Sequence, residues 1–460
     1  MRAKFVFNGT GTRGDLAPML AMAAEMQGRG HDVHVLGNDS AGHLPRELGV
    51  PFTAVAPAQT NNLTSVEENF GRHVFASYRP TFEYIEAERA RGRDVIIVNS
   101  ESYAASTLMA ERHQLPLCRY ILTPFRIFSL EAPFYPHNVK VHGRLGHTYR
   151  RYVLPGLRDK RHAHPYILTR LNEFRATLGL PPVTSLRALE PLVTHHVCLF
   201  PDWYAPPASD WPQPLDCVGF PMPEPRGELP TDVERWLVQH EAPLVFTPGT
   251  GVVDVQAFFA AATRCCELLR RPGLFLSPHL PARPLAAEGE VLHCAFLELG
   301  LVLRRAALLV HHGGIGTTAR AIEAGIPQII SPQAFDQPDN GDRVSRLGVG
   351  AMLERDDLTG EALAEVVSRL LASEATQRAL RQLSARVRAS DAISAMADVL
   401  EQRFLAPSAS RVRTLGPSAL GSPEGRTGSA AQKVCRHANT GPTWQRAPVA
   451  LPLVEEGLQR

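Results

Sequence analysis

Twice along this chain, a short apolar run leads directly into a glycine-rich loop and then into a helical pattern. The first occurrence joins KFVFN (residues 4–8) to GTGTRGDLAP (9–18). The second joins PLVFTPGTG (243–251) to a helical stretch at 254–270. A strand that turns tightly into a helix is the opening of a βαβ unit, which builds parallel sheet. The repetition therefore predicts two α/β halves, each with its own sheet.

Strand-like and helical stretches keep alternating after each opening. Alternation of this kind predicts parallel sheets with helices on both faces. The further strand-like runs are at 32–37, 94–100 and 117–123 in the first half, and at 273–279, 307–314 and 328–332 in the second.

Proline separates the two halves, being dense across residues 201–232. Because proline breaks both helix and strand, we place the linker between domains in this stretch. Residues 406–460 are rich in Ser, Gly, Pro and Arg with little periodicity, which is typical of a disordered tail. The expected divisions are an N-terminal domain at 1–216, a linker at 217–232, a C-terminal domain at 233–386, and a helix at 387–405 that packs back on the N-terminal domain.

Composition excludes several classes of protein. The net charge of +2 comes from 48 basic and 46 acidic residues, which gives no electrostatic case for nucleic acid. The sequence contains no run of about 18 apolar residues, so no membrane span is predicted. The N-terminus reaches glycine and aspartate too early for the apolar core of a secretory signal. The seven cysteines lack zinc-site spacing, which favours a reducing compartment. We expect a cytoplasmic protein.

The segment VHHGGIGTTARAIEAGIPQIISPQAFDQ (310–337) resembles a ligand-binding loop. Glycines let the backbone approach a ligand closely, and a helix N-terminus attracts anions. His312 directly precedes these glycines and could donate a hydrogen bond to a phosphate oxygen. The alternative is a tight turn in which both histidines are merely packed. The residues placed to meet a phosphate are Gly313, Gly314, Gly316, Thr317 and Thr318.

An acid–amide pair follows the next strand-like run. Asp336 and Gln337 come just after QIISP, where the loops of a parallel sheet line its ligand crevice. With Asn340, they would offer donors and acceptors to a polyhydroxylated group such as a sugar. Such a pair is commonplace on solvated loops, but beside a phosphate cradle it indicates a sugar attached to a phosphate.

These motifs carry a family resemblance. HHGGIGTTARAIEAGIPQIISPQAFDQPDNGDRVSRLGVG (311–350) resembles the donor-binding segment of GT-B glycosyltransferases of the UDP-glycosyltransferase superfamily, in the bacterial branch that glycosylates antibiotics, sterols and lipids. FDQPDN and RLGVG are similar to rhamnosyltransferases of rhamnolipid synthesis. The similarity spans roughly residues 4–400 and is weak across 55–240. It implies a GT-B fold, with two Rossmann-like, doubly wound parallel-sheet domains facing a cleft.

The resemblance also implies roles for residues of the C-terminal domain. His312 corresponds to the histidine that contacts the donor α-phosphate, while Asp336 and Gln337 correspond to the pair that binds the donor sugar. Cys294 stands near the position of a base-stacking tryptophan of plant members, and Arg320 replaces their ribose-binding glutamate. Recognition of the base and ribose is therefore not implied, and UDP and dTDP stay open. Further diphosphate contacts are implied for Gly314, Gly316, Thr317 and Thr250.

Asp15, in GTRGDLAP, stands where plant members have a catalytic histidine. Transfer to a hydroxyl needs a base that removes its proton, and the loop of Asp15 is expected to face the cleft. The aspartate that orients the plant histidine is replaced near Ser100, which is consistent because a carboxylate base needs no such partner. The alternative is that Asp15 caps the helix that follows, and the two roles are compatible.

Aromatic and apolar residues at 120–136 would suit the wall of an acceptor pocket. Ordinary core packing is the alternative for each of them. As a group they favour a hydrophobic small-molecule or lipid acceptor, and a transient association with a membrane surface stays open. The expected acceptor contacts are Phe125, Phe128, Tyr135 and His137.

The predicted function is an inverting transfer of a hexosyl or deoxyhexosyl group, rhamnosyl among them, from a UDP- or dTDP-sugar to a hydroxyl of that acceptor. No metal motif is present, so we expect metal-independent chemistry with no cofactor besides the nucleotide-sugar co-substrate. Two alternatives remain: a catalytically silent nucleotide-sugar-binding partner protein, and an epimerase on the same fold. A nicotinamide dehydrogenase fits least, because neither glycine loop reads G-x-G-x-x-G with a later acid.

Overall fold

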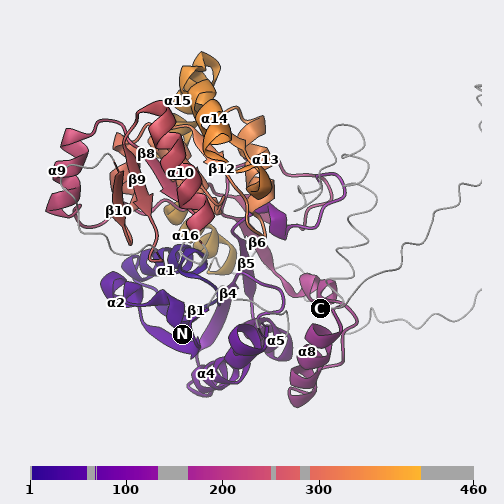
Figure 1. Cartoon of the computed structure of the whole chain (residues 1–460). Coiled ribbons are helices and arrows are strands. Elements are labelled where there is room, and N and C mark those ends of the chain that lie inside the picture. Colours follow the sequence, from indigo (N-terminus) through magenta and orange to yellow (C-terminus); the bar gives the residue numbers. More distant parts are fainter. Residues whose placement is uncertain are drawn as a thin grey trace, which may run out of the picture. The chain divides into compact units, whose positions relative to one another are not determined.

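The computed structural model describes residues 3–59, 68, 70–132, 164–249, 255–279 and 291–405. They form two parallel sheets, each accompanied by helices (Figure 1). One sheet has seven strands in the order β3-β2-β1-β4-β5-β6-β7, and the other has six in the order β10-β9-β8-β11-β12-β13. The α/β prediction of two doubly wound parallel sheets is confirmed. The predicted tail at 406–460 lies outside the described residues.

The first sheet is built around β1, where Phe5, Val6 and Phe7 are completely buried. Such burial is expected of a parallel strand covered on both faces. β2 and β4 pair with β1 on opposite sides, and the strand order proceeds outward from there in both directions. The loops after β1 and β4 therefore flank a topological switch point. The strands are β1 Ala3–Asn8, β2 Asp32–Asn38, β3 Phe52–Ala56, β4 Asp94–Asn99, β5 Leu117–Ile121, β6 His195–Cys198 and β7 Leu215–Cys217. The longer helices are α1 Arg13–Gly28, α4 Tyr78–Ala90, α5 Ala105–His113 and α8 Pro165–Thr177.

The second sheet repeats the plan, with its switch point between β8 and β11. The loops after those two strands are therefore the counterparts of the loops after β1 and β4. Its strands are β8 Leu244–Thr247, β9 Gly273–Leu276, β10 Val291–Cys294, β11 Leu308–His311, β12 Gln328–Ile330 and β13 Gly350–Met352. The helices of this half are α9 Thr231–Gln239, α10 Gln256–Leu269, α11 Leu299–Val302, α12 Ile315–Ala324, α13 Gln337–Arg346, α14 Gly360–Ala372 and α15 Glu374–Arg388.

The last helix among the described residues, α16, spans Ala392–Phe404. Met396, Leu400 and Phe404 pack into the hydrophobic core that contains β1 and α1. Arg29, which follows α1, pairs with Asp398 at 2.6 Å across this contact. The helix starts later than the expected residue 387, because α15 ends at Arg388 and α16 begins at Ala392 after a break. The Asp391 side chain marks that start by accepting a hydrogen bond from Ser394 N at 3.0 Å.

The proline-rich stretch is less irregular than its composition indicates. β7 lies inside it and pairs with β6, so that Cys198 stands opposite Cys217. The strand is tolerated among the prolines because it lies at the edge of the described sheet. Pro214, which lacks an N–H, precedes the first strand residue and so removes no donor from the strand itself. The predicted linker at 217–232 therefore overlaps β7 at one end and α9, which begins at Thr231, at the other.

Candidate active site

A cavity of about 2170 Å³ is lined by residues from both halves. The first half contributes the loops after β1, β4 and β5, and the second contributes those after β8, β11 and β12. Three predicted residues, Thr250, Tyr135 and His137, lie outside the described residues. The structure brings most of the other predicted site residues together in the wall of this cavity: Asp15, Phe125, Phe128, His312, Gly314, Gly316, Thr317, Asp336 and Gln337. Gly313 and Thr318, also expected to meet the phosphate, do not line it. The expectation for Thr318 is wrong, because its side chain is fully buried and its hydroxyl donates to Gly314 O at 3.0 Å.

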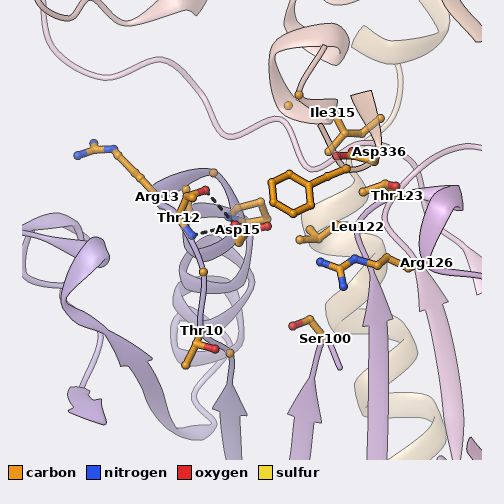
Figure 2. A pocket seen from close by; sticks show the side chains of 18 of the residues that line it. Thr10, Thr12, Arg13, Asp15, Ser100, Leu122, Thr123, Arg126, Ile315 and Asp336 are labelled. Atoms are coloured by element: carbon orange, nitrogen blue, oxygen red, sulfur yellow. Dashed lines mark hydrogen bonds between the residues drawn. The ribbon is translucent and has the colours of Figure 1, made fainter. Parts of the chain in front are cut away.

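Asp15 is half-buried in the first turn of α1, where it takes part in a capping box. Its Oδ2 accepts hydrogen bonds from Thr12 N at 2.8 Å and Thr12 Oγ1 at 2.9 Å (Figure 2). Both bonds use the same oxygen, and no donor within the described residues bonds to Oδ1. Asp15 therefore does cap the start of α1, as the alternative interpretation expected. The capping bonds use only Oδ2, and Oδ1 of the carboxylate is left for a ligand.

The two histidines that follow β11 have different surroundings. His311 is fully buried; its Nε2 pairs with Gln328 Oε1 at 2.9 Å and its Nδ1 accepts from Gly313 N at 3.1 Å. His312 lines the cavity, and its buried Nδ1 has no hydrogen-bond partner in the described part of the chain. Burial lowers the pKa of His312 to about 4, so the free protein holds a neutral imidazole at pH 7. Of these two histidines, only His311 is packed in the interior with both ring nitrogens hydrogen-bonded.

Two glycines make room for the His312 ring. A Cβ on Gly249, whose φ is +95°, would lie 2.9 Å from His312 Nδ1. A Cβ on Gly314 would lie 2.7 Å from Nε2 of the same ring. Gly314 is also the N-cap of α12, whose first turn lines the cavity with Gly316 and Thr317. The N–H groups of a first helical turn have no partner within the helix, so this helix start has the chemistry to bind an anion.

Asp336 and Gln337 lie at the start of α13. Asp336 Oδ2 accepts from Asn340 Nδ2 at 2.9 Å. Gln337 Oε1 accepts from the backbone nitrogens of Gln333 and Ala334 at 2.7 and 3.0 Å, so its NH₂ group remains as a donor. One carboxylate oxygen and one amide group are thus available to a ligand.

The expectation that Asn340 contacts the sugar is wrong. Asn340 is completely buried and does not line the cavity. Its Nδ2 also donates to Gly313 O at 2.9 Å, and its Oδ1 accepts from the Tyr204 hydroxyl at 2.8 Å. It therefore ties the glycine loop to the start of α13 and fixes the position of Asp336 relative to His312.

Burial raises the pKa of the Asp336 carboxyl to about 6. The positive charge of Arg126 and the hydrogen bond from Asn340 oppose this rise, while the negative charge of Asp15 adds to it. Figure 2 shows Arg126, Asp15 and Asp336 around the same cavity. The two carboxylates and the guanidinium are thus electrostatically linked.

Sequence reasoning missed several charged and aromatic residues of the wall. Arg126 forms an ion pair with Glu101 at 2.6 Å, and both line the cavity. They directly follow Phe125 and Ser100, two positions that the sequence already placed near the site. The sequence did not indicate that the two charged side chains pair with each other. Phe296, 56% exposed, lies two residues after Cys294, and the Arg13 guanidinium lies 5.4 Å from the centre of its ring.

Other properties of the described residues bear on the site. None of their helices is both long and apolar enough to span a bilayer. Nor do three or more His, Cys, Asp or Glu side chains in these ranges gather so that they could hold a metal ion. Arg320, at the position of the plant ribose-binding glutamate, lines the cavity and pairs with Glu323 at 2.8 Å.

Comparisons with known proteins give matches at both ends of the chain. The glycosyltransferase family 28 N-terminal domain matches residues 5–116, and the erythromycin biosynthesis protein CIII-like C-terminal domain matches residues 284–402. Glycosyltransferase GtfC of Amycolatopsis orientalis is 26% identical over 396 residues, covering 82% of this chain and 92% of the relative.

Solved structures share the fold. The glycosyltransferase of kitacinnamycin superposes with a TM-score of 0.68 at 18% identity, covering 88% of this chain and 99% of that one. Spinosyn rhamnosyltransferase SpnG, complexed with thymidine diphosphate, superposes with a TM-score of 0.59 at 17% identity, covering 87% and 100%. With a glycosyltransferase domain matched in the N-terminal half, an erythromycin biosynthesis protein CIII-like domain in the C-terminal half and a glycosyltransferase relative along most of the chain, the chain belongs to the GT-B glycosyltransferases of the bacterial antibiotic and natural-product type.

Proposed function

We propose that this glycosyltransferase moves a hexosyl or deoxyhexosyl group from a UDP- or dTDP-sugar to a hydroxyl of a hydrophobic small molecule or lipid, with inversion at the anomeric carbon. One observation supports this most directly. Asp15, a carboxylate with an available oxygen, lines the same cavity as His312 and the start of α12, which have the chemistry to bind an anion. A base and a leaving-group site are the two parts that a direct displacement needs.

On the donor side, the amides of the first turn of α12 and the Thr317 hydroxyl would bind the diphosphate. A neutral His312 would add one N–H donor, and the leaving-group charge would be stabilised by fixed dipoles without a metal ion. The free Asp336 oxygen would accept hydrogen bonds from sugar hydroxyls, and the Gln337 amide would donate one.

On the acceptor side, Asp15 Oδ1 would take the proton of the acceptor hydroxyl as its oxygen attacks the anomeric carbon. The new C–O bond forms as the bond from that carbon to the diphosphate oxygen breaks, and the charge passes to the leaving diphosphate. Phe125, Phe128 and Leu130 line the cavity and support an apolar acceptor. Leu130 is 43% exposed, as a side chain awaiting an apolar ligand would be.

A screen of UDP- and dTDP-sugars, dTDP-rhamnose included, against alcohol acceptors tests the proposal. We expect one nucleotide series to raise the melting temperature, and its sugar to be consumed in proportion to added acceptor. The SpnG complex with thymidine diphosphate is the reason to include the dTDP series. Sugar binding without turnover would favour a silent binding protein, and conversion to another nucleotide sugar without acceptor would favour an epimerase.

Donor affinity is expected to depend on pH through Asp336. Sugar hydroxyls bind the ionised carboxylate better, and its pKa is about 6, so affinity should rise as pH increases through that value. Between about pH 5 and about pH 7.5 we expect a gain of up to tenfold, since hydrogen bonds to a charged group contribute about 1.5–3 kcal/mol.

Calorimetric titration with a nucleotide sugar measures the effect, because its diphosphate diester keeps a constant charge over this range. The Asp336→Asn variant should bind more weakly at high pH and show a flat profile. A profile of the same slope in the variant would assign the dependence to another group.

A further inference from the structure

His73 is a buried histidine that the reaction described above does not use. It lies in a single helical turn at Phe70–Val74, between β3 and α4, and is only 5% exposed. It nevertheless lines the cavity, and its Nδ1 is buried with no hydrogen-bond partner among the residues described. Folded proteins leave few buried polar atoms unpaired, because each one gives up its hydrogen bonds to water. A ligand atom in the cavity can restore the bond that this nitrogen lacks once the imidazole ring turns to present it to the cavity.

A second histidine in the same wall has the same property. His164 immediately precedes α8, lines the cavity, and has a buried Nδ1 without a partner in the described ranges. The two elements are in contact, since a Cβ on Gly71 would lie 3.1 Å from the Tyr166 hydroxyl. The ring centres of Phe75 and Tyr166 lie 6.1 Å apart. Two unpaired imidazoles therefore come from neighbouring segments of the first half.

A continuous wall connects these histidines with the reaction centre. Arg126, which faces the cavity with Asp15 in Figure 2, forms its ion pair with Glu101. Tyr103 is two residues further along the chain and also lines the cavity. Its ring centre lies 5.4 Å from that of Phe70, which belongs to the same turn as His73. The wall thus passes from charged groups near Asp15 to aromatic ones beside His73.

We propose that His73, together with His164, forms a subsite that selects the acceptor. The subsite would bind a neutral hydrogen-bonding group, a hydroxyl or a carbonyl, at the end of an apolar acceptor away from the hydroxyl that receives the sugar. An imidazole nitrogen can donate or accept such a bond. A charged group is disfavoured because it would lose its hydration among Phe70, Tyr103 and Ile167. This inference rests on the proposed function, since it places the acceptor in this half of the cavity.

The test compares the binding of two alcohols, a decanediol with one hydroxyl at each end and decanol with one hydroxyl only. Dissociation constants are measured by calorimetry for the wild type, His73→Leu, His73→Asn and His164→Leu. We expect the wild type to bind the diol about fivefold more tightly than the mono-alcohol, the value of one neutral hydrogen bond. His73→Leu should bring that ratio close to one. His73→Asn, whose amide stands near the position of Nδ1, should restore part of it, and His164→Leu should reduce it.

Binding of UDP or dTDP shows that each variant is folded. A wild-type ratio near one would overturn the proposal, and so would a ratio unchanged in a folded His73→Leu variant. Both measurements concern alcohol binding and need no sugar transfer. Failure of the nucleotide-sugar screen would therefore refute the transferase proposal without altering the alcohol ratios, and failure of the alcohol test would leave the transferase proposal standing.

Discussion

Replacing Asp15 with asparagine is expected to reduce sugar transfer by about 10²–10⁴-fold, the usual contribution of a general base, while nucleotide-sugar binding is nearly unchanged. Asparagine keeps an oxygen that can accept the two bonds from Thr12, so the start of α1 should stay in place. It cannot take a proton from the acceptor. Turnover under saturating donor and acceptor measures the loss, and calorimetry with the nucleotide sugar measures binding.

Thr12→Ala is the matched control, because it disturbs the capping box without removing the carboxylate. It deletes the hydroxyl that donates to Asp15 Oδ2 at 2.9 Å and should destabilise the protein by about 0.5–2 kcal/mol. Its turnover should fall far less than that of Asp15→Asn. If the two variants lost activity equally, helix capping would explain the importance of Asp15. If Asp15→Asn kept most of its turnover, another group would be the base.

Much of this site could be predicted because it follows from local patterns. Asp15 follows a strand of the first sheet, whereas His312 and Asp336 follow strands of the second. In each parallel sheet such positions gather at the carboxyl edge of the strands, and both of these edges line the cavity. The glycines beside His312 mark the edge of the second sheet, since the backbone must turn sharply there. A strand followed by a glycine loop was therefore sufficient to predict both the fold class and the general position of the cavity.

The roles of adjacent residues could not be predicted, because contacts distant in the sequence decide them. His311 is packed because Gln328 of β12 accepts its hydrogen, and that partner depends on strand order. Asn340 holds two loops together because Tyr204, far away in the chain, fills its remaining acceptor. His73 lies in an irregular turn without periodicity, so no pattern in the sequence indicated that it faces the cavity.

Replacing His312 with alanine is expected to weaken nucleotide binding and turnover together. A hydrogen bond to a charged phosphate contributes about 1.5–3 kcal/mol, so the dissociation constant should rise about 10–150-fold. His312→Gln keeps an N–H donor and should recover part of the affinity. Because the imidazole is neutral in the free protein, the loss reflects a donated hydrogen bond rather than a removed charge. Calorimetry with UDP and dTDP measures the change.

Gly314→Ala tests the same contact without touching the histidine. Its new Cβ would lie 2.7 Å from His312 Nε2, so the ring must move and nucleotide affinity should fall toward that of His312→Ala. Gly316→Ala is the companion variant two residues later, and there a Cβ meets no protein atom within 4 Å. In this variant the His312 ring should keep its position, so any loss of affinity would indicate that the new methyl group contacts the nucleotide itself. Wild-type affinity in both His312→Ala and Gly314→Ala would rule out His312 as a phosphate ligand.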